Sequence, residues 1–154
     1  MNKAIAIGDN LHTWFMYNTM NLLRISIGII YVWFGLLKYF PNLSPADQLA
    51  KDTICLTTFC LIPSNESIIL LATWETLLGF LLIANIWQRV AFYALLLHLL
   101  GTFIPLFFFA DISFTNSPFV LTLIGQYIMK NTIIVCAALV LNAYSNRENK
   151  MHMG

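Results

Sequence analysis

The stretch LLATWETLLGF, residues 70–80, decides the fold class and also raises the question of function. Seven of its eleven residues are Leu, Ala, Trp or Phe, yet Glu75 lies in the middle of them. Over all 154 residues, 59% are hydrophobic and 10% are charged, whereas a soluble domain has about 25% charged residues. We therefore predict an integral membrane protein with a single domain, residues 1–154.

The apolar residues fall into four runs that are long enough to cross a membrane. A helix needs ~20 mainly apolar residues to span the bilayer core, and such runs lie at about 22–40, 67–87, 90–109 and 118–144. The prediction is an all-α, four-helix membrane bundle. Residues 1–20 are expected to lie at the membrane interface, and residues 145–154 to form a polar tail. A long polar loop joins the first two spans, and Ser44 can begin a short helix in it.

The basic residues predict the orientation of the bundle, because cytoplasmic loops carry an excess of lysine and arginine. Lys38 and Lys51 fall on one side, together with the long loop and several carboxylates. We expect the opposite side, and with it both termini, to be cytoplasmic. A net charge of +1 argues against binding of nucleic acid. The basic residues on the side expected to be cytoplasmic are Lys3, Arg24, Arg89, Arg147 and Lys150.

The three cysteines show no spacing that is typical of a metal site, and no metal is expected. Cys55 and Cys60 lie in the long loop. They form a disulfide if that loop faces an oxidising compartment, but a C-x4-C spacing does not decide the matter. Cys136 lies within an apolar run and is expected to be a core residue.

Each span carries small or polar residues at three- or four-residue spacing, which places them on one helical face. Such stripes are typical of helix–helix interfaces in lipid, so Glu75 is expected to point into the bundle. Gly28, Gly35 and Gly79 are expected to allow close packing. The four stripes are Arg24, Gly28, Tyr31, Gly35 and Lys38; Ala72, Glu75, Thr76 and Gly79; Ala94, His98, Gly101, Thr102 and Pro105; and Thr122, Gln126 and Lys130, with Ala137 further along the same face.

Glu75, His98 and Lys130 fall near the predicted midplane of the bilayer, ~12 to ~18 Å from a span end. A charge at that depth costs ~2.5–3.5 kcal/mol. We expect Glu75 to pair with Lys130, and His98 or Gln126 to hydrogen-bond to either member. Two interpretations stay open: the cluster has a chemical role, or it only fixes the packing of the helices. Arg24 and Lys38 lie near the span ends, where their side chains can also extend to the membrane surface.

The first span, LLRISIGIIYVWFGLLKYFP at residues 22–41, has the pattern Arg24-x3-Gly28-x6-Gly35-x2-Lys38. This pattern resembles the DoxX-like family of small four-span membrane proteins. With its long outer loop, the chain is similar to the subgroup that includes the inner-membrane reactive-chlorine resistance proteins. The resemblance covers about residues 20–142 and implies a four-helix bundle in the bacterial cytoplasmic membrane. The second span and the following turn continue it with Glu75, Gly79 and Arg89.

The resemblance also implies a function, because family members are linked to quinone-dependent oxidation, to oxidative-stress complexes and to assembly roles. The first hypothesis is a redox-linked subunit that binds a quinone or a small electron-rich molecule. The sequence contains no cofactor-binding motif, so an enzymatic role would need a quinone or a partner subunit. The second hypothesis is a non-enzymatic accessory or assembly protein, which acts with another membrane protein or as a homo-oligomer. The third is a small transporter or channel.

Overall fold

The structure, a computed structural model, describes residues 2–40, 47–115 and 120–151, and side chains within 11–147 of these ranges. The described residues form helices joined by turns, with no β-strand longer than the single bridge between Phe114 and Leu121. The expected helix start at Ser44 lies outside the described residues. The helices are α1 (Asn2–Leu37), α2 (Asp47–Thr58), α3 (Ser64–Ala84), α4 (Gln88–Phe108), α5 (Ala110–Ser113) and α6 (Leu123–Met151).

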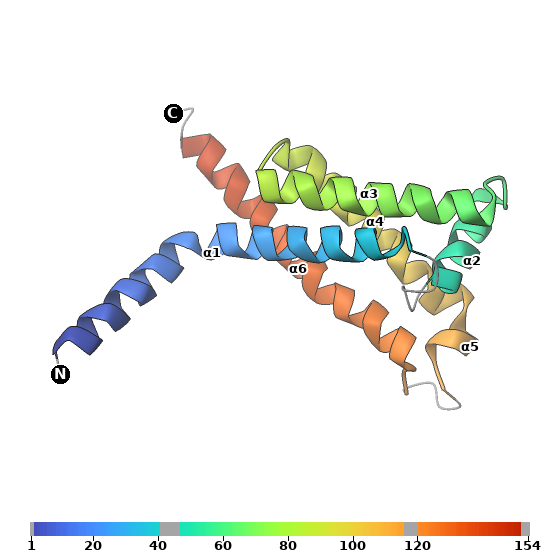
Figure 1. The fold of residues 1–154 in the computed structure, drawn as a ribbon, viewed down its shortest axis with the longest axis horizontal. Coiled ribbons are helices and arrows are strands. Elements are labelled where there is room, and N and C mark those ends of the chain that lie inside the picture. The colour runs from blue at the N-terminus through green and yellow to red at the C-terminus, as the bar shows by residue number, and fades with distance from the viewer. Residues whose placement is uncertain (1, 41–46, 116–119, 152–154) are drawn as a thin grey trace.

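Four of the described helices are long and apolar enough to cross a membrane, and they are α1, α3, α4 and α6 in Figure 1. The candidate spans are Leu11–Leu37, Ser64–Ala84, Gln88–Phe108 and Leu123–Arg147. The prediction of an all-α membrane bundle is therefore confirmed, and the chain is a multi-pass membrane protein. The predicted start of the fourth span, Pro118, lies outside the described residues.

The described part of the chain is helical at both of its ends. Residues 2–20 are the first part of α1 and not a separate segment, and Figure 1 shows this part turning away from the bundle. Their position at the membrane interface stays a prediction. The expected polar tail from residue 145 is likewise helical, since α6 continues to Met151.

The connection between α3 and α4 is a three-residue turn that begins at Asn85. Asn85 has a φ of 59°, in the left-handed region that ends a helix, and its N–H donates to the carbonyls of Leu81 and Leu82. Trp87 is also left-handed, and α4 begins at Gln88. The second span thus ends three residues earlier than its predicted end at Trp87, because Asn adopts this conformation at small cost.

Helices α1 and α3 run antiparallel and form the most extensive contact of the bundle (Figure 1). Three glycines let the two backbones meet. A Cβ atom on Gly79 would lie 2.7 Å from the carbonyl oxygen of Gly28, and one on Gly35 would lie 2.8 Å from the amide nitrogen of Thr76. Real Cβ atoms essentially never approach so closely. The predicted role of Gly28, Gly35 and Gly79 in packing is therefore confirmed.

Helix α4 completes the bundle between the α1–α3 pair and α6. The side chains of Leu95 and Leu99 are each 1% exposed and lie at the centre of the core. Around them pack residues from four helices: Ile27, Tyr31, Leu78, Leu82, Ala91, Phe92 and Ala138.

The long loop contains the short helix α2, which packs against α3 and α4. Leu49 and Thr53 are its buried residues. Figure 1 shows α2 beside the beginning of α3, beyond the end of α1. Cys55 and Cys60 form a disulfide between α2 and the turn that follows it.

The inward stripes predicted for the first two spans are confirmed. Gly28, Tyr31 and Gly35 of α1 are buried, as are Ala72, Glu75 and Gly79 of α3. The stripe of the third span is confirmed only in part, because nothing lies within 4 Å of a Cβ atom added to Gly101.

The stripe of the fourth span is confirmed for Thr122, which donates to the carbonyl of Ile112 at 2.6 Å, and for Ala137, which packs against the core, but it is wrong for Gln126 and Lys130. The buried residues of α6 are Gly125, Ile128 and Ala138, and Gln126 and Lys130 are exposed. Gly125 makes a close backbone contact here, since a Cβ atom on it would overlap the carbonyl oxygen of Ser113. Cys136, expected in the core, is exposed as well.

A buried ion cluster as the candidate functional site

The candidate site is an ion pair between Lys38 and Glu75. The Nζ atom of Lys38 lies 2.5 Å from Oε2 of Glu75, and the two side chains are 10% and 8% exposed. Glu75 is ~16 Å along α3 from its first residue and ~14 Å from its last. The pair therefore lies near the middle of a membrane-spanning helix, where an unpaired charge is costly.

The packing of α1 on α3 explains why Lys38 reaches this depth. Gly35 rests on Ala72 and Thr76, so the end of α1 lies beside the middle of α3. Lys38 is the first residue after α1, at the negative end of the helix dipole, which favours a cation. The sequence predicted Lys38 near the outer edge of the membrane, but the structure places it at the level of Glu75.

His98 of α4 adds a third member to the cluster. Its Nε2 atom lies 3.4 Å from Oε1 of Glu75, and its side chain is 9% exposed. Each carboxylate oxygen of Glu75 thus has its own neighbour, an amine on one side and an imidazole on the other. The ring of Tyr31 packs edge-on against His98, with 5.3 Å between the ring centroids. We call Lys38, Glu75, His98 and Tyr31 the ion cluster.

The expected pairing of Glu75 with Lys130 is wrong. Lys130 is exposed on α6, and its Nζ atom lies 5.1 Å from the centroid of the Tyr127 ring. Gln126 is also exposed, and its side-chain amide donates to the carbonyl of Leu121, one turn back. Neither residue belongs to the ion cluster, because α6 turns Gly125 and Ile128 toward the bundle instead.

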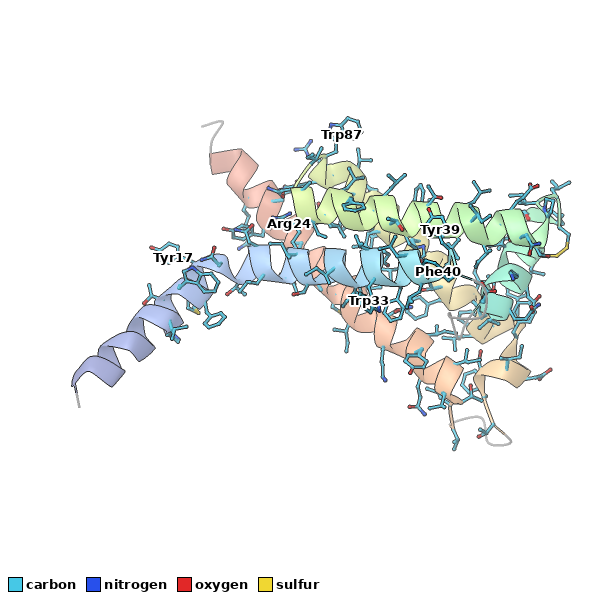
Figure 2. The ribbon with its side chains drawn as sticks, viewed as in Figure 1. Tyr17, Arg24, Trp33, Tyr39, Phe40 and Trp87 are labelled. Carbon is cyan, nitrogen blue, oxygen red and sulfur yellow. A yellow bond between two sulfur atoms is a disulfide. The ribbon has the colours of Figure 1, made fainter. Side chains whose placement is uncertain are left out.

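Arg24 lies on the same stripe as the cluster but at the other end of α3. Its guanidinium donates to the carbonyl of Leu82 and, at 3.1 Å, to that of Ile83. A second guanidinium nitrogen lies 3.4 Å from Oδ1 of Asn21. Arg24 thus binds the last carbonyls of α3, which have no partner within the helix. Figure 2 shows it between α1 and α3.

Further polar contacts between elements were not predicted, among them that of the Ser145 hydroxyl on α6, which donates to Oε1 of Gln88 on α4 at 2.5 Å. The side-chain amide of Asn131 on α6 donates to Oγ1 of Thr102 on α4 at 3.2 Å. The hydroxyls of Tyr39 and Thr73 lie 2.8 Å apart. Asn131 follows Lys130 directly in the sequence, and it is the residue that faces α4. The polar residues 130–132 indicate a helix contact at this position. The three- or four-residue spacing used for the stripe selects Lys130, whereas Asn131 makes the contact.

The chemistry that this arrangement supports is proton transfer. An amine, a carboxylate and an imidazole are in contact inside a low-dielectric bundle, and each can bind or release a proton. Among the residues that the structure describes, no three His, Cys, Asp or Glu side chains are grouped in a way that could hold a metal ion. The cluster itself supplies no electron carrier.

The fold and the site define a small multi-pass membrane protein with an ion cluster in the middle of its bundle. No protein-family model matches the chain, and no curated protein or solved structure is similar enough to it to count as a match.

Proposed function

We propose that this protein is a DoxX-like, redox-linked subunit of the bacterial inner membrane that binds a quinone or another small electron-rich molecule. The observation that carries the proposal is the contact of Glu75 with both Lys38 and His98 near the middle of α3. Ionisable residues within membrane spans are rare and mark proton relays and ligand sites. The resemblance of the first span to DoxX-like proteins supports a redox role.

In this proposal the cluster exchanges protons with the bound molecule. Reduction of a quinone to a quinol adds electrons and an equal number of protons. Glu75 and His98 would deliver the protons, and Lys38 would stabilise negative charge that develops on a quinone oxygen. The electrons would come from a partner redox protein. The side chains of Lys38, Glu75 and His98 each keep about a tenth of their surface accessible, so the ligand would approach the cluster from its edge.

The proposed orientation has both termini in the cytoplasm and α2 on the outside. Arg24, Arg89 and Arg147 all lie toward the end of the bundle where α3 turns into α4, which the positive-inside rule assigns to the cytoplasm. The disulfide between Cys55 and Cys60 supports the placement of α2 outside, since disulfides persist in oxidising compartments. Reporter fusions at each terminus and in the α2 loop test this orientation.

The binding test uses protein purified in mild detergent from bacterial membranes that contain quinone. Organic extraction and chromatography then measure the quinone bound per protein. We expect the unaltered protein to retain quinone and Glu75→Gln to lose most of it. Lys130→Met is the matched control, because it removes a charge of the same helical bundle outside the cluster, and it should retain quinone.

Two results would contradict the proposal. One is the absence of quinone from the unaltered protein, and the other is equal retention by Glu75→Gln and Lys130→Met. Size-exclusion profiles of the variants establish that both remain folded, so that a loss of quinone is not a loss of the bundle.

A second candidate function, that of an accessory or assembly protein, is favoured by the exposure of α6. In the most apolar 18-residue stretch of α6, only 17% is buried within the structure, whereas 39% of the corresponding stretch of α3 is buried. A partner subunit or a second copy of the chain would cover the exposed face around Tyr127, Lys130 and Ile133. Co-purification distinguishes the two functions: a stoichiometric partner that survives Glu75→Gln and is lost from Lys130→Met favours assembly.

A further inference from the structure

A cavity lies at the end of the bundle where α3 turns into α4, away from the ion cluster. Its volume is about 190 Å³, and residues of α1, α3, α4 and α6 line it. Figure 2 marks this end by Arg24 and by Trp87 in the α3–α4 turn. Its polar lining residues include Asn21, Arg24, Asn85, Gln88, Arg89 and Asn142.

The cavity is positively charged. Arg24 and Arg89 both line it, and none of its lining residues is acidic. Arg24 is held in place by its bonds to the carbonyls of Leu82 and Ile83, which leaves other N–H groups of its five donors available. Arg89 is exposed and makes no hydrogen bond or ion pair with any residue that the structure describes. Two guanidinium groups therefore face one space, and no carboxylate among the described lining residues balances them.

The inner wall of the cavity is apolar. Leu81, Phe92, Leu95 and Leu141 line it together with the polar groups. Phe92 and Leu95 are buried and continue directly into the core of the bundle. A ligand that fits this cavity would thus carry an anionic group at one end and an apolar portion beside it.

The position of the cavity along the helices agrees with that chemistry. Helix α3 ends at Ala84, α4 begins at Gln88, and the span of α6 ends at Arg147. The cavity therefore lies where three spans leave the apolar layer, at the depth of the lipid headgroups. Basic pockets between transmembrane helices are typical sites for acidic lipid headgroups.

We propose that this cavity binds the phosphate headgroup of an acidic phospholipid. The cavity volume of about 190 Å³ is many times the ~10–15 Å³ that a single water needs by the same kind of measure, so the cavity has room for a phosphate group and part of its headgroup. Arg24 and Arg89 hold the phosphate oxygens through charge-assisted hydrogen bonds, which arginine makes in pairs. The side-chain amides of Asn85 and Asn142 face the rest of the headgroup, and the acyl chains follow the outside of the bundle.

The test compares three additions to the full-length protein in a neutral detergent: phosphatidylglycerol, phosphatidylcholine and inorganic phosphate. Native mass spectrometry counts the bound lipid, and thermal unfolding reports stabilisation. We expect phosphatidylglycerol to bind and to raise the midpoint of unfolding, whereas phosphatidylcholine and inorganic phosphate leave it unchanged. Arg89→Gln should weaken phosphatidylglycerol binding about tenfold, the effect of losing one charge-assisted hydrogen bond.

The control is Arg147→Gln. Arg147 is an exposed arginine at the same end of the bundle, but it does not line the cavity. It should bind phosphatidylglycerol as the unaltered protein does. Because Arg24 also binds α3, it is tested with Arg24→Lys, which keeps the charge but loses the paired hydrogen bonds; weaker lipid binding by this folded variant supports the proposal.

Two outcomes overturn the lipid assignment. If inorganic phosphate stabilises the protein as much as phosphatidylglycerol does, the site takes a free anion and not a lipid. If Arg89→Gln and Arg147→Gln weaken lipid binding equally, the attraction is a general surface charge and not this cavity. Neither outcome affects the quinone proposal, whose residues lie elsewhere in the bundle.

Discussion

Lys38 and Glu75 are in contact although Lys38 directly follows α1 and Glu75 lies in the middle of α3. The two helices are therefore offset along their axes, so that the end of α1 lies beside Glu75 in the middle of α3. The offset is set by backbone contacts at Gly28, Gly35 and Gly79. Small residues on one helix face thus decide which cation reaches the carboxylate.

Removal of one member of the pair should destabilise the bundle. Glu75→Leu leaves the Lys38 amine buried without its carboxylate, and loss of one partner of a buried pair costs ~3–5 kcal/mol. The double variant Lys38→Met, Glu75→Leu should recover most of that loss, because apolar residues can replace a buried pair at little cost. Unfolding in mixed detergent micelles measures the free energies.

Lys130→Met serves as the control for the ion pair. An exposed side chain away from special features contributes less than about 0.5 kcal/mol, so this variant should unfold like the unaltered protein. A loss from Lys130→Met as large as that from Glu75→Leu would mean that Lys130 is the true partner.

Gly79→Ala should destabilise the contact between α1 and α3. The added methyl group would lie 2.7 Å from the carbonyl oxygen of Gly28 and equally close to the amide nitrogen of Val32. Such overpacking costs ~1–3 kcal/mol. Gly101→Ala is the matched control, because nothing lies within 4 Å of its added Cβ, and it should be neutral or slightly stabilising. Equal losses at the two sites would contradict the packing described.

Asn131→Leu should have a smaller effect. It removes the hydrogen bond to Thr102 between α6 and α4, and such bonds within membrane bundles contribute ~0.6 kcal/mol on average. A double-mutant cycle with Thr102→Val isolates the pairwise part of that loss. Thr132→Leu, at an exposed position of α6, gives the comparison. A coupling energy indistinguishable from zero would argue against the contact.

The cysteines provide a covalent test of the fold and of the orientation. The chain has three cysteines, and the structure joins Cys55 to Cys60 and leaves Cys136 free. Protein isolated without reductant and then denatured should react with one equivalent of a polyethylene glycol maleimide, and with three after reduction. Cys55→Ser should react with two without reductant. Three equivalents for the unreduced protein would exclude the disulfide under those conditions.

Much of the fold could be predicted from the sequence because membrane spans are set by length and apolarity alone. The inward faces of α1 and α3 were also predictable, since glycine at three- or four-residue spacing marks close contact. The ends of the helices were less predictable, because the turn at Asn85 depends on one residue adopting a left-handed conformation. The end of α3 was therefore misplaced by three residues.

The partner of Glu75 could not be predicted, because pairing depends on how far one helix is shifted along another. The sequence places Lys130 and Glu75 at similar depths if all spans begin at the same level. The structure shifts α1 so that Lys38 meets Glu75, and it rotates α6 so that Lys130 leaves the interface. A one-residue step on a helix turns a side chain by about 100°, which suffices to move it from the interface to the lipid.

The early end of α1 makes the two routes from water to the ion cluster unequal. On the side of the disulfide, α2 takes the place of α1 beside the first part of α3, and at twelve residues it is too short to span the membrane. It packs on α3 and α4 through Leu49 and Thr53 and covers this end of the bundle. On the opposite side, α1 and α3 stay in backbone contact at Gly28 and Gly79, and the cavity beside Arg24 reaches inward as far as Leu95. The two ends of the bundle thus differ in what separates the ion cluster from the surface: a short helix at one end, and the buried side chains below the cavity at the other.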